Sequence, residues 1–436
     1  MIVFRDLPRR LGRVTSGGAY VAQIDGLRFL AILPVLFFHA GLRGARISPD
    51  PEVNEALISA WLPMGGLGVS LFFFISGYII AYPFLSGRPP RLADFYKRRL
   101  LRLEPPYIIV MLGCFVILSH YPPVRAPNFY FTEAPLWQSL MASLTYTHGI
   151  IFGQNPRLNP PAWSLEREIQ FYLLAPFLIY VYQRIGNWRA RVWWGGAVCL
   201  TLVVLGEVIR SGLGLQHPLQ HTVLAESYGF CLGILVCDHS VRTQPFQQVA
   251  RRSYDLCLLL GYIGLLITGV FEPKIQLLGS SNPVFDIAAG ISNSLARAAC
   301  IVLVFAGAAR GLAGRAILGS PWITLIGGAC YSIYLVHLPV MHASAEIIVH
   351  VMRPDSLVVS AILCWAVLIP ASIAAGLVFY ACIERPCMRP DWPGDFIRAI
   401  KAWRSGSTSP VPANAPCDAD SMVAVPPGSS FPGPAA

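Results

Sequence analysis

Long apolar runs that are nearly free of charged residues recur along the chain. A helix of about 18 such residues, rising ~1.5 Å per residue, comes close to the ~30 Å of a hydrocarbon core. Only 13% of the 436 residues are charged and 55% are hydrophobic, whereas a soluble domain has about 25% charged residues. The spans of a β-barrel would be short and alternating instead. The sequence therefore predicts an all-α integral membrane protein.

The apolar runs predict a bundle of about ten transmembrane helices. We expect these spans near residues 24–42, 63–85, 104–120, 168–183, 192–209, 219–237, 254–271, 284–309, 321–343 and 357–383. The chain then divides into a basic N-terminal segment (1–23), a membrane domain (24–390) and a tail (391–436). Pro, Ser, Gly and Ala dominate most of the tail, which is typical of disorder.

The formal net charge is +10, and the basic residues lie in short loops beside the apolar runs. This distribution is typical of membrane topology, so we expect no nucleic-acid partner. Cytoplasmic loops of membrane proteins hold an excess of Lys and Arg. Both termini and the basic stretch 88–102 are therefore predicted to be cytoplasmic.

Residues 136–153 are apolar but are not counted as a span, because one more crossing would place the arginine-rich loops outside. We expect a re-entrant or surface-lying segment within a long external connection, residues 121–167. Irregular backbone at membrane depth is tolerated where it lines a cavity or is buried in protein. The proline-rich stretch 155–162 predicts such backbone, since proline opposes regular helix.

Ionisable residues in the first span are the first candidates for a functional site. Arg28 and His39 lie about three helical turns apart, ~16 Å along the axis, on nearly the same face. Asp25 lies one turn before Arg28. Ionisable groups inside a bilayer are costly and indicate function, although Asp25 and Arg28 could instead anchor the helix at the interface. A neutral His39 imidazole would suit proton abstraction from a hydroxyl group.

A second candidate lies at the cytoplasmic mouth of the third span. Arg99 and Arg102 are spaced i, i+3 and share one helix face, where two planar guanidinium groups suit phosphate oxygens. The alternative is that these arginines only orient the helix in the membrane.

Two further stretches carry polar residues at the ends of apolar helices. Ser164 is predicted to cap the fourth span, and Glu168 leads directly into its apolar part, which favours burial. Glu166 and Glu168 could instead be surface acids that complement the helix dipole. His337 lies in the ninth span, where a lone histidine is more often a packing residue than a ligand; Tyr334 is a possible partner.

Taken together, these stretches resemble the acyltransferase 3 family of integral-membrane O-acyltransferases. The matching motifs are DGLR (25–28) with His39, GVSLFFFISGY (68–78), RLLRLEP (99–105), WSL (163–165) with EIQFY (168–172), CYSIYLVH (330–337) and IERP (383–386). The resemblance covers about residues 20–390. One departure is the charged pair Glu166 and Arg167, where the family usually has uncharged residues.

The resemblance implies a ten-helix bundle in a bacterial cytoplasmic (inner) membrane that transfers an acyl group, usually acetyl, from acyl-CoA to a hydroxyl of a cell-surface or exported glycan. It implies that acyl-CoA is a co-substrate and not a permanently bound cofactor. The roles it implies are catalysis for Arg28, His39 and Glu168, donor binding for Arg28, Arg99 and Arg102, and substrate contacts for Asp25, Trp163, Ser164 and His337. Neither the histidines nor the eleven cysteines have metal-ligand spacing, so no metal is expected.

These features predict a two-sided site. Acyl-CoA would approach from the cytoplasm and the glycan from the outside, and His39 would either deprotonate the sugar hydroxyl or carry the acyl group covalently. The alternative from another functional class is a proton-coupled transporter or flippase, whose proton relays use the same residue types. A transporter would need no acyl-CoA site.

Overall fold

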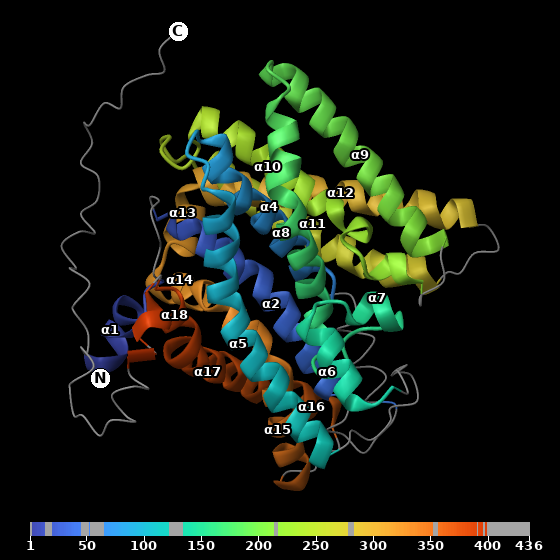
Figure 1. Cartoon of the computed structure of the whole chain (residues 1–436), viewed down its shortest axis with the longest axis vertical. Coiled ribbons are helices and arrows are strands. Elements are labelled where there is room, and N and C mark those ends of the chain that lie inside the picture. Colours follow the sequence, from blue (N-terminus) through green and yellow to red (C-terminus); the bar gives the residue numbers. More distant parts are fainter. Residues whose placement is uncertain are drawn as a thin grey trace. The chain divides into compact units, whose positions relative to one another are not determined.

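In the computed structural model, helices make up every regular element of the described residues, which are 2–13, 20–44, 52, 65–121, 134–212, 217–277, 283–351, 356–389, 391–395 and 397–398 (Figure 1). The chain forms two units, Met1–Met388 and Arg389–Ala436. The first unit holds all of the helices that bear on the site. The all-α membrane fold expected from the sequence is confirmed.

A helix or a helix pair occupies the position of each expected span. They are α2 (Ala22–Gly44), α4 (Leu67–Leu85), α5 (Leu92–His120), α8 (Trp163–Gln183), α9 (Trp188–Gly212), α10 (Ser227–Thr243), α11 (Ser253–Leu277), α12 (Pro283–Arg310), α14 (Pro321–Gly328) with α15 (Cys330–Val351), and α16 (Leu357–Leu363) with α17 (Ile369–Phe379). Among the described residues, seven helices are long and apolar enough to cross a membrane, and the bent pair α14–α15 would be an eighth. The count of ten stays a prediction.

Several boundaries differ from the sequence prediction. Helix α5 begins at Leu92 and not near residue 104, so its first three turns are charged and its apolar part follows. The span expected at 219–237 instead begins with two short 3₁₀ turns, Pro218–His221 and Val223–Ala225, before α10. The span expected at 321–343 is bent by 71° between α14 and α15. The first two corrections lie where charged residues or a proline interrupt the apolar pattern, whereas the bend lies at the small residues Gly327–Ala329.

Helix α2 lies among α4, α14 and α15, as Figure 1 shows. The contact with α14 is very close, because a Cβ atom on Gly327 would lie only 1.8 Å from the carbonyl oxygen of Asp25. Only glycine allows this approach of the two backbones. The N-terminal end of α2, with Asp25 and Arg28, is thereby fixed against the bend between α14 and α15.

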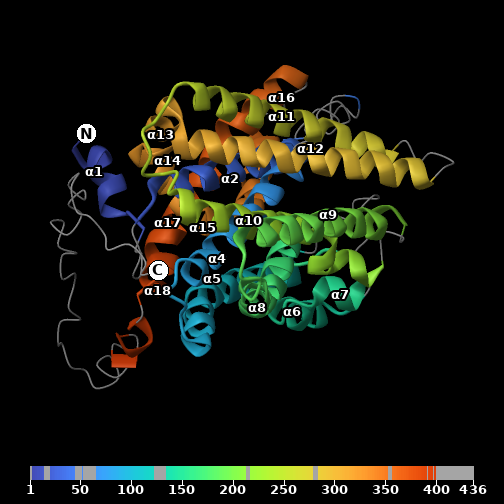
Figure 2. The ribbon, with the colours of Figure 1, turned by 90° about the horizontal axis from the view of Figure 1, so that it is seen from above.

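The other helices pack around this centre in pairs. Helices α11 and α12 run side by side along their whole length, and α9 lies next to α10 (Figure 2). Helix α4 packs on α10 through Gly77 and Gly233, where an added Cβ would lie 2.2 Å from a carbonyl oxygen of the facing helix. Small residues let membrane helices approach in this way. Helix α4 in turn lies beside α2, and α8 packs on α4.

The segment 136–153 consists of two short helices, α6 (Leu136–Leu144) and α7 (His148–Phe152). At ~1.5 Å per residue, neither is long enough to cross a bilayer. Tyr146 lies between them in a left-handed conformation, with φ of 56°. The Tyr107 hydroxyl donates to the Ser143 carbonyl at 2.9 Å, which attaches the segment to α5. Two such short helices agree with the expectation that 136–153 is not a span, and the re-entrant or external placement stays a prediction. Part of the predicted connection, 122–133, lies outside the described residues.

Near the N-terminus, α1 (Ile2–Arg10) is a short helix followed by Leu11, Gly12 and Arg13. In the second unit, residues 392–395 form a helical turn. The remainder of the predicted disordered tail, from residue 399, lies outside the described part of the chain. The proposed division at residues 23 and 390 stays a prediction.

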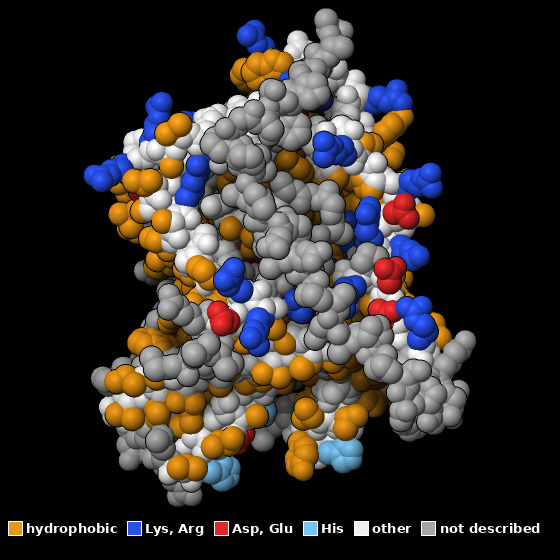
Figure 3. All heavy atoms as spheres, turned by 90° about the vertical axis from the view of Figure 1, so that its left-hand side faces the viewer, with side chains coloured by type: hydrophobic (Ala, Val, Ile, Leu, Met, Phe, Trp, Pro, Cys, Tyr) orange, Lys and Arg blue, Asp and Glu red, His pale blue; other side chains and the backbone are white. Residues whose placement is uncertain are grey.

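One face of the molecule carries most of the basic side chains in view. Figure 3 shows this face, which includes the region of α1, α13 (Leu312–Leu318), α14 and α18 (Arg385–Cys387) on the left of Figure 1. Lys and Arg side chains are spread across it, and acidic side chains are few. By the positive-inside rule, this is the face expected toward the cytoplasm.

Candidate functional site

Helix α2 carries both residues of the predicted catalytic pair. It is helical throughout Ala22–Gly44 although Pro34 lies inside it, so Arg28 and His39 keep their predicted separation of ~16 Å. Asp25 is 1% exposed, and one of its carboxylate oxygens binds Arg28 at 2.6 Å and Arg13 at 2.9 Å. The interpretation of Asp25 as an interfacial anchor is therefore wrong. It is a buried carboxylate that holds two guanidinium groups.

Arg102 forms an ion pair that the sequence analysis missed. Its guanidinium binds Glu384 at 3.2 Å, and the Glu384 side chain is fully buried. The other Glu384 oxygen accepts hydrogen bonds from the Ser332 hydroxyl at 2.6 Å and the Ser332 amide at 3.2 Å. The available signal was Glu384 itself, the acid of the IERP motif, which directly follows an apolar run. Arg102 thus lies beside the bend of α14–α15 and close to the end of the apolar C-terminal helix.

Arg99 lies on aromatic rings. Its guanidinium carbon is 3.8 Å from the centre of the Phe95 ring and 5.4 Å from that of Tyr172. It also donates to the Phe95 carbonyl at 3.5 Å. The planar guanidinium suits such stacking better than an ammonium group. Arg99 and Arg102 therefore share a helix face, as predicted, but they are held by different partners.

Glu168 faces the interior next to these arginines. Its Oε1 accepts hydrogen bonds from the hydroxyls of Ser76 on α4 and Tyr172 on α8. A narrow pocket reaches this carboxylate. Its lining residues are Leu103, Tyr146, Leu165, Glu168, Ile169, Tyr172 and Tyr331. Because Tyr172 contacts both Arg99 and Glu168, a predicted donor-binding residue and a predicted catalytic residue come together here.

Glu166 has a different environment from Glu168, although only two residues separate them. Its two oxygens accept hydrogen bonds from the backbone amides of His148 at 3.1 Å and Gly149 at 3.0 Å. It is 1% exposed, so its interpretation as a surface acid is wrong. Burial lowers the pKa of His148 to about 4, which keeps this neighbour neutral. The unusual glutamate of this chain thus binds the first turn of α7.

Ser164 does not cap its helix, so that prediction is wrong. Helix α8 begins at Trp163, one residue before Ser164, and no side chain caps it, because a 3₁₀ turn leads directly into it. The Ser164 hydroxyl instead lies 2.6 Å from the hydroxyl of Tyr334, which donates to the Pro161 carbonyl at 2.6 Å. Trp163 stacks under Arg167, with the guanidinium carbon 4.4 Å from the ring centre.

His39 and His337 form a pair of facing imidazoles, with ring centres 4.9 Å apart. His337 is fully buried, and its Nδ1 lies 2.6 Å from the carbonyl oxygen of Tyr334. A carbonyl only accepts, so Nδ1 carries the proton and Nε2 has the free lone pair. Within the described part of the chain, Nε2 has no hydrogen-bond partner. The sequence favours a packing role for His337, because it does not show that this residue meets His39.

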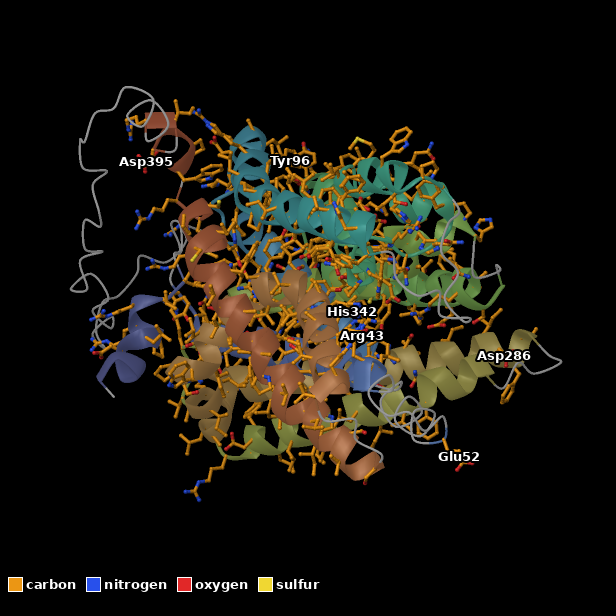
Figure 4. All side chains as sticks on the ribbon, turned by 90° about the horizontal axis from the view of Figure 1, so that it is seen from below. Arg43, Glu52, Tyr96, Asp286, His342 and Asp395 are labelled. Carbon is orange, nitrogen blue, oxygen red and sulfur yellow. The ribbon has the colours of Figure 1, made fainter. Side chains whose placement is uncertain are left out.

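Beyond the two histidines, another pair of basic residues joins α2 to the middle of α15. An Arg43 nitrogen lies 3.5 Å from Nδ1 of His342, and Figure 4 shows the two residues next to each other. Polar groups therefore continue along α2 and α15 from Asp25 and Arg28 at one end to Arg43 at the other. Over the described ranges, no group of three or more His, Cys, Asp or Glu residues could hold a metal ion.

Comparison with known proteins finds acyltransferases among the proteins that this chain is similar to. The family model described as an acyltransferase domain matches residues 21–381. The acyltransferase MdmB of Streptomyces mycarofaciens is 26% identical over 88% of this chain and 94% of its own length. No solved structure matches the chain significantly.

Two more relatives match over part of their length. The peptidoglycan O-acetyltransferase OatA of Listeria monocytogenes is 27% identical over 47% of this chain, and the O-acetyltransferase OatA of Staphylococcus aureus is 28% identical over 37%. These alignments cover only 29% and 25% of the two OatA proteins. The family model nevertheless spans most of the chain, including every predicted site residue. The chain belongs to the acyltransferase 3 family and is a membrane-embedded O-acyltransferase.

Proposed function

We propose that this protein transfers an acyl group, acetyl in the simplest case, from cytoplasmic acyl-CoA to a hydroxyl of a cell-surface or exported glycan. The observation that carries the proposal is the structure of α2 and its partners. Arg28 lies in a group of buried arginines at one end, and His39 faces His337 about three turns away. Such an arrangement suits a long donor whose phosphates and thioester are far apart.

The donor end would be the arginine group. This group consists of Arg28, Arg99 and Arg102. Asp25 joins Arg28 to Arg13, and Arg102 binds Glu384 next to α18. The group would therefore lie toward the basic face, which includes α1 and α18, where acyl-CoA from the cytoplasm would arrive. Guanidinium groups bind phosphate oxygens through paired hydrogen bonds. Asp25 would act by positioning Arg28, since its carboxylate binds that residue directly.

His39 would act as the general base. Its imidazole would take the proton from the acceptor hydroxyl while the oxygen attacks the thioester carbonyl. The C–O bond forms, the C–S bond breaks, and the CoA thiolate leaves and takes up a proton. His337 would position His39 and offer its Nε2 lone pair to the proton that His39 accepts, because its own Nδ1–H is held by the Tyr334 carbonyl.

The acceptor would enter from the opposite side, near α6, α7 and the start of α8. Trp163 offers an aromatic face there, and Ser164 leads to the histidine pair through Tyr334. The OatA relatives are O-acetyltransferases, and the one from Listeria is named for peptidoglycan. These names support a glycan as the acceptor class. Family membership favours the transferase over the transporter interpretation.

An acceptor-dependent thiol-release assay tests this proposal. Purified protein in lipid nanodiscs would receive acetyl-CoA with and without a glycan extract, and free CoA would be measured with a thiol reagent. We expect thiol release that depends on the glycan, together with acetyl ester on the glycan by mass spectrometry. Movement of a solute across proteoliposomes without thiol release would support the transporter instead.

A further inference from the structure

Arg13 lies outside the stretch that the family model matches, residues 21–381, yet it reaches the candidate site. Its guanidinium binds the Asp25 carboxylate at 2.9 Å, on the same oxygen that binds Arg28. The neighbouring Gly12 carbonyl accepts a hydrogen bond of 3.4 Å from Arg385, which holds the segment against the end of the C-terminal helix. Gly12 and Arg13 thus lie against the candidate site.

The surroundings of Arg13 hold more positive than negative charge, because the three arginines Arg13, Arg28 and Arg102 face two carboxylates, Asp25 and Glu384. Asp25 must serve both Arg13 and Arg28, and the side chains of both arginines are only 13% exposed. Burial lowers the pKa of Arg13, and the nearby charge of Arg102 lowers it further. Three largely buried cations held by two anions favour a further anionic group close by.

Free hydrogen-bond donors point to the same conclusion. The Nε–H groups of Arg13 and Arg102 are both buried and have no hydrogen-bond partner in the described part of the chain. Buried donors are nearly always satisfied, so donors of this kind indicate a ligand or water in the working protein. Phosphate oxygens are the acceptors that guanidinium groups match best.

We infer that Arg13 is a donor-binding residue, and that it completes a phosphate site formed with Arg28 and Arg102. This inference rests on the proposed function, because acyl-CoA supplies the phosphates. The site would hold the nucleotide end of the donor and leave the thioester free to extend along α2 toward His39. The transfer chemistry itself would not involve Arg13.

The test compares two acetyl donors that differ in their phosphates. Acetyl-CoA carries them and S-acetyl-pantetheine does not, so a phosphate-binding residue affects only the first. We expect R13A to raise the KM for acetyl-CoA about tenfold or more and to change the KM for S-acetyl-pantetheine less than twofold. R13K should lie between wild type and R13A, since lysine keeps the charge and loses the planar fork.

Arg10 supplies the matched control. It lies on α1 and is exposed, so R10A removes the same charge from the same segment without touching the site. We expect R10A to have the KM of wild type for both donors. Folding is judged by elution as a single species in detergent. If R13A does not fold by this criterion, R13K alone tests the inference.

The possible failures can be told apart. Equal losses with both donors, or equal effects of R10A and R13A, would show that Arg13 is only structural or acts through net charge, and would overturn the inference. A wild-type KM for acetyl-CoA in R13A would also overturn it, while the proposed function would stand. A wild-type protein that uses neither donor would overturn both. Relief of the R13A defect by adding anionic lipid to the nanodiscs would assign the site to lipid phosphate and overturn the nucleotide assignment.

Discussion

At the scale of single residues, Glu166 and Glu168 show how two neighbouring acids take different roles. Glu166 accepts hydrogen bonds only from backbone amides of α7, whereas Glu168 accepts them from two hydroxyls beside a pocket. The first arrangement fixes a segment of backbone. The second leaves the carboxylate close to where a substrate would lie.

This difference predicts opposite effects for two isosteric substitutions. E166Q places an amide NH₂ against a backbone N–H, and leaving that buried N–H without an acceptor should destabilise the fold by about 2 kcal/mol. E168Q can keep its accepted hydrogen bonds through the amide oxygen, so it should retain the melting temperature and lose at least about tenfold in acylation rate. Melting in detergent and the thiol-release assay measure the two effects. A stable E166Q that has lost activity would contradict the assignment.

Whether the sequence predicts a contact between two residues depends on how far apart they lie along the chain. The relation of Arg28 to His39 follows from their spacing on one helix, and it is found in the structure. The contacts of Arg102 with Glu384 and of His39 with His337 join residues about 280–300 positions apart. Helical periodicity carries no information about such contacts, because it relates only residues of the same helix.

At the scale of helices, the close packing of α4 on α10 depends on glycines at the contact, which have no side chain. A Cβ atom on Gly77 would lie 2.2 Å from the carbonyl oxygen of Phe230, and backbone atoms cannot move aside as a flexible side chain can. We expect G77A to destabilise the protein by about 1–3 kcal/mol through overpacking. Thermal melting in detergent would measure this.

Gly113 provides the control for this prediction. It lies inside α5, and no atom lies within 4 Å of the position that its Cβ would take. G113A should therefore leave the melting temperature unchanged or slightly raised. Equal destabilisation by G77A and G113A would mean that helix propensity, and not the close approach of α4 and α10, sets the effect.

Helix positions were easier to predict than helix ends. Apolar runs locate the membrane-crossing parts, but α5 continues outward through charged residues from Leu92. This stretch is helical although it is polar, so hydropathy alone does not show where the helix begins. The bend at Ala329, between α14 and α15, depends on the packing of Gly327 against α2, which is a tertiary contact.

At the scale of the whole molecule, the account requires the basic face to be cytoplasmic and the α6–α7 segment to be external. Single cysteines in a version without the eleven native cysteines test this. Asn155 and Arg98 are both exposed, so N155C and R98C are suitable labelling sites. We expect a membrane-impermeant reagent, added to intact cells, to label only N155C. Labelling of R98C alone would invert the topology.

The central claim is that one site spans the molecule, with donor binding at the arginines and chemistry at His39. The most direct test is H39Q, measured for donor affinity and for acylation rate in the same preparation. Glutamine keeps a polar group of similar reach but cannot accept and return a proton at neutral pH. We predict a rate at least about 100-fold below wild type with an acetyl-CoA Kd within about twofold of wild type. An H39Q protein that acylates its acceptor at the wild-type rate would contradict the account.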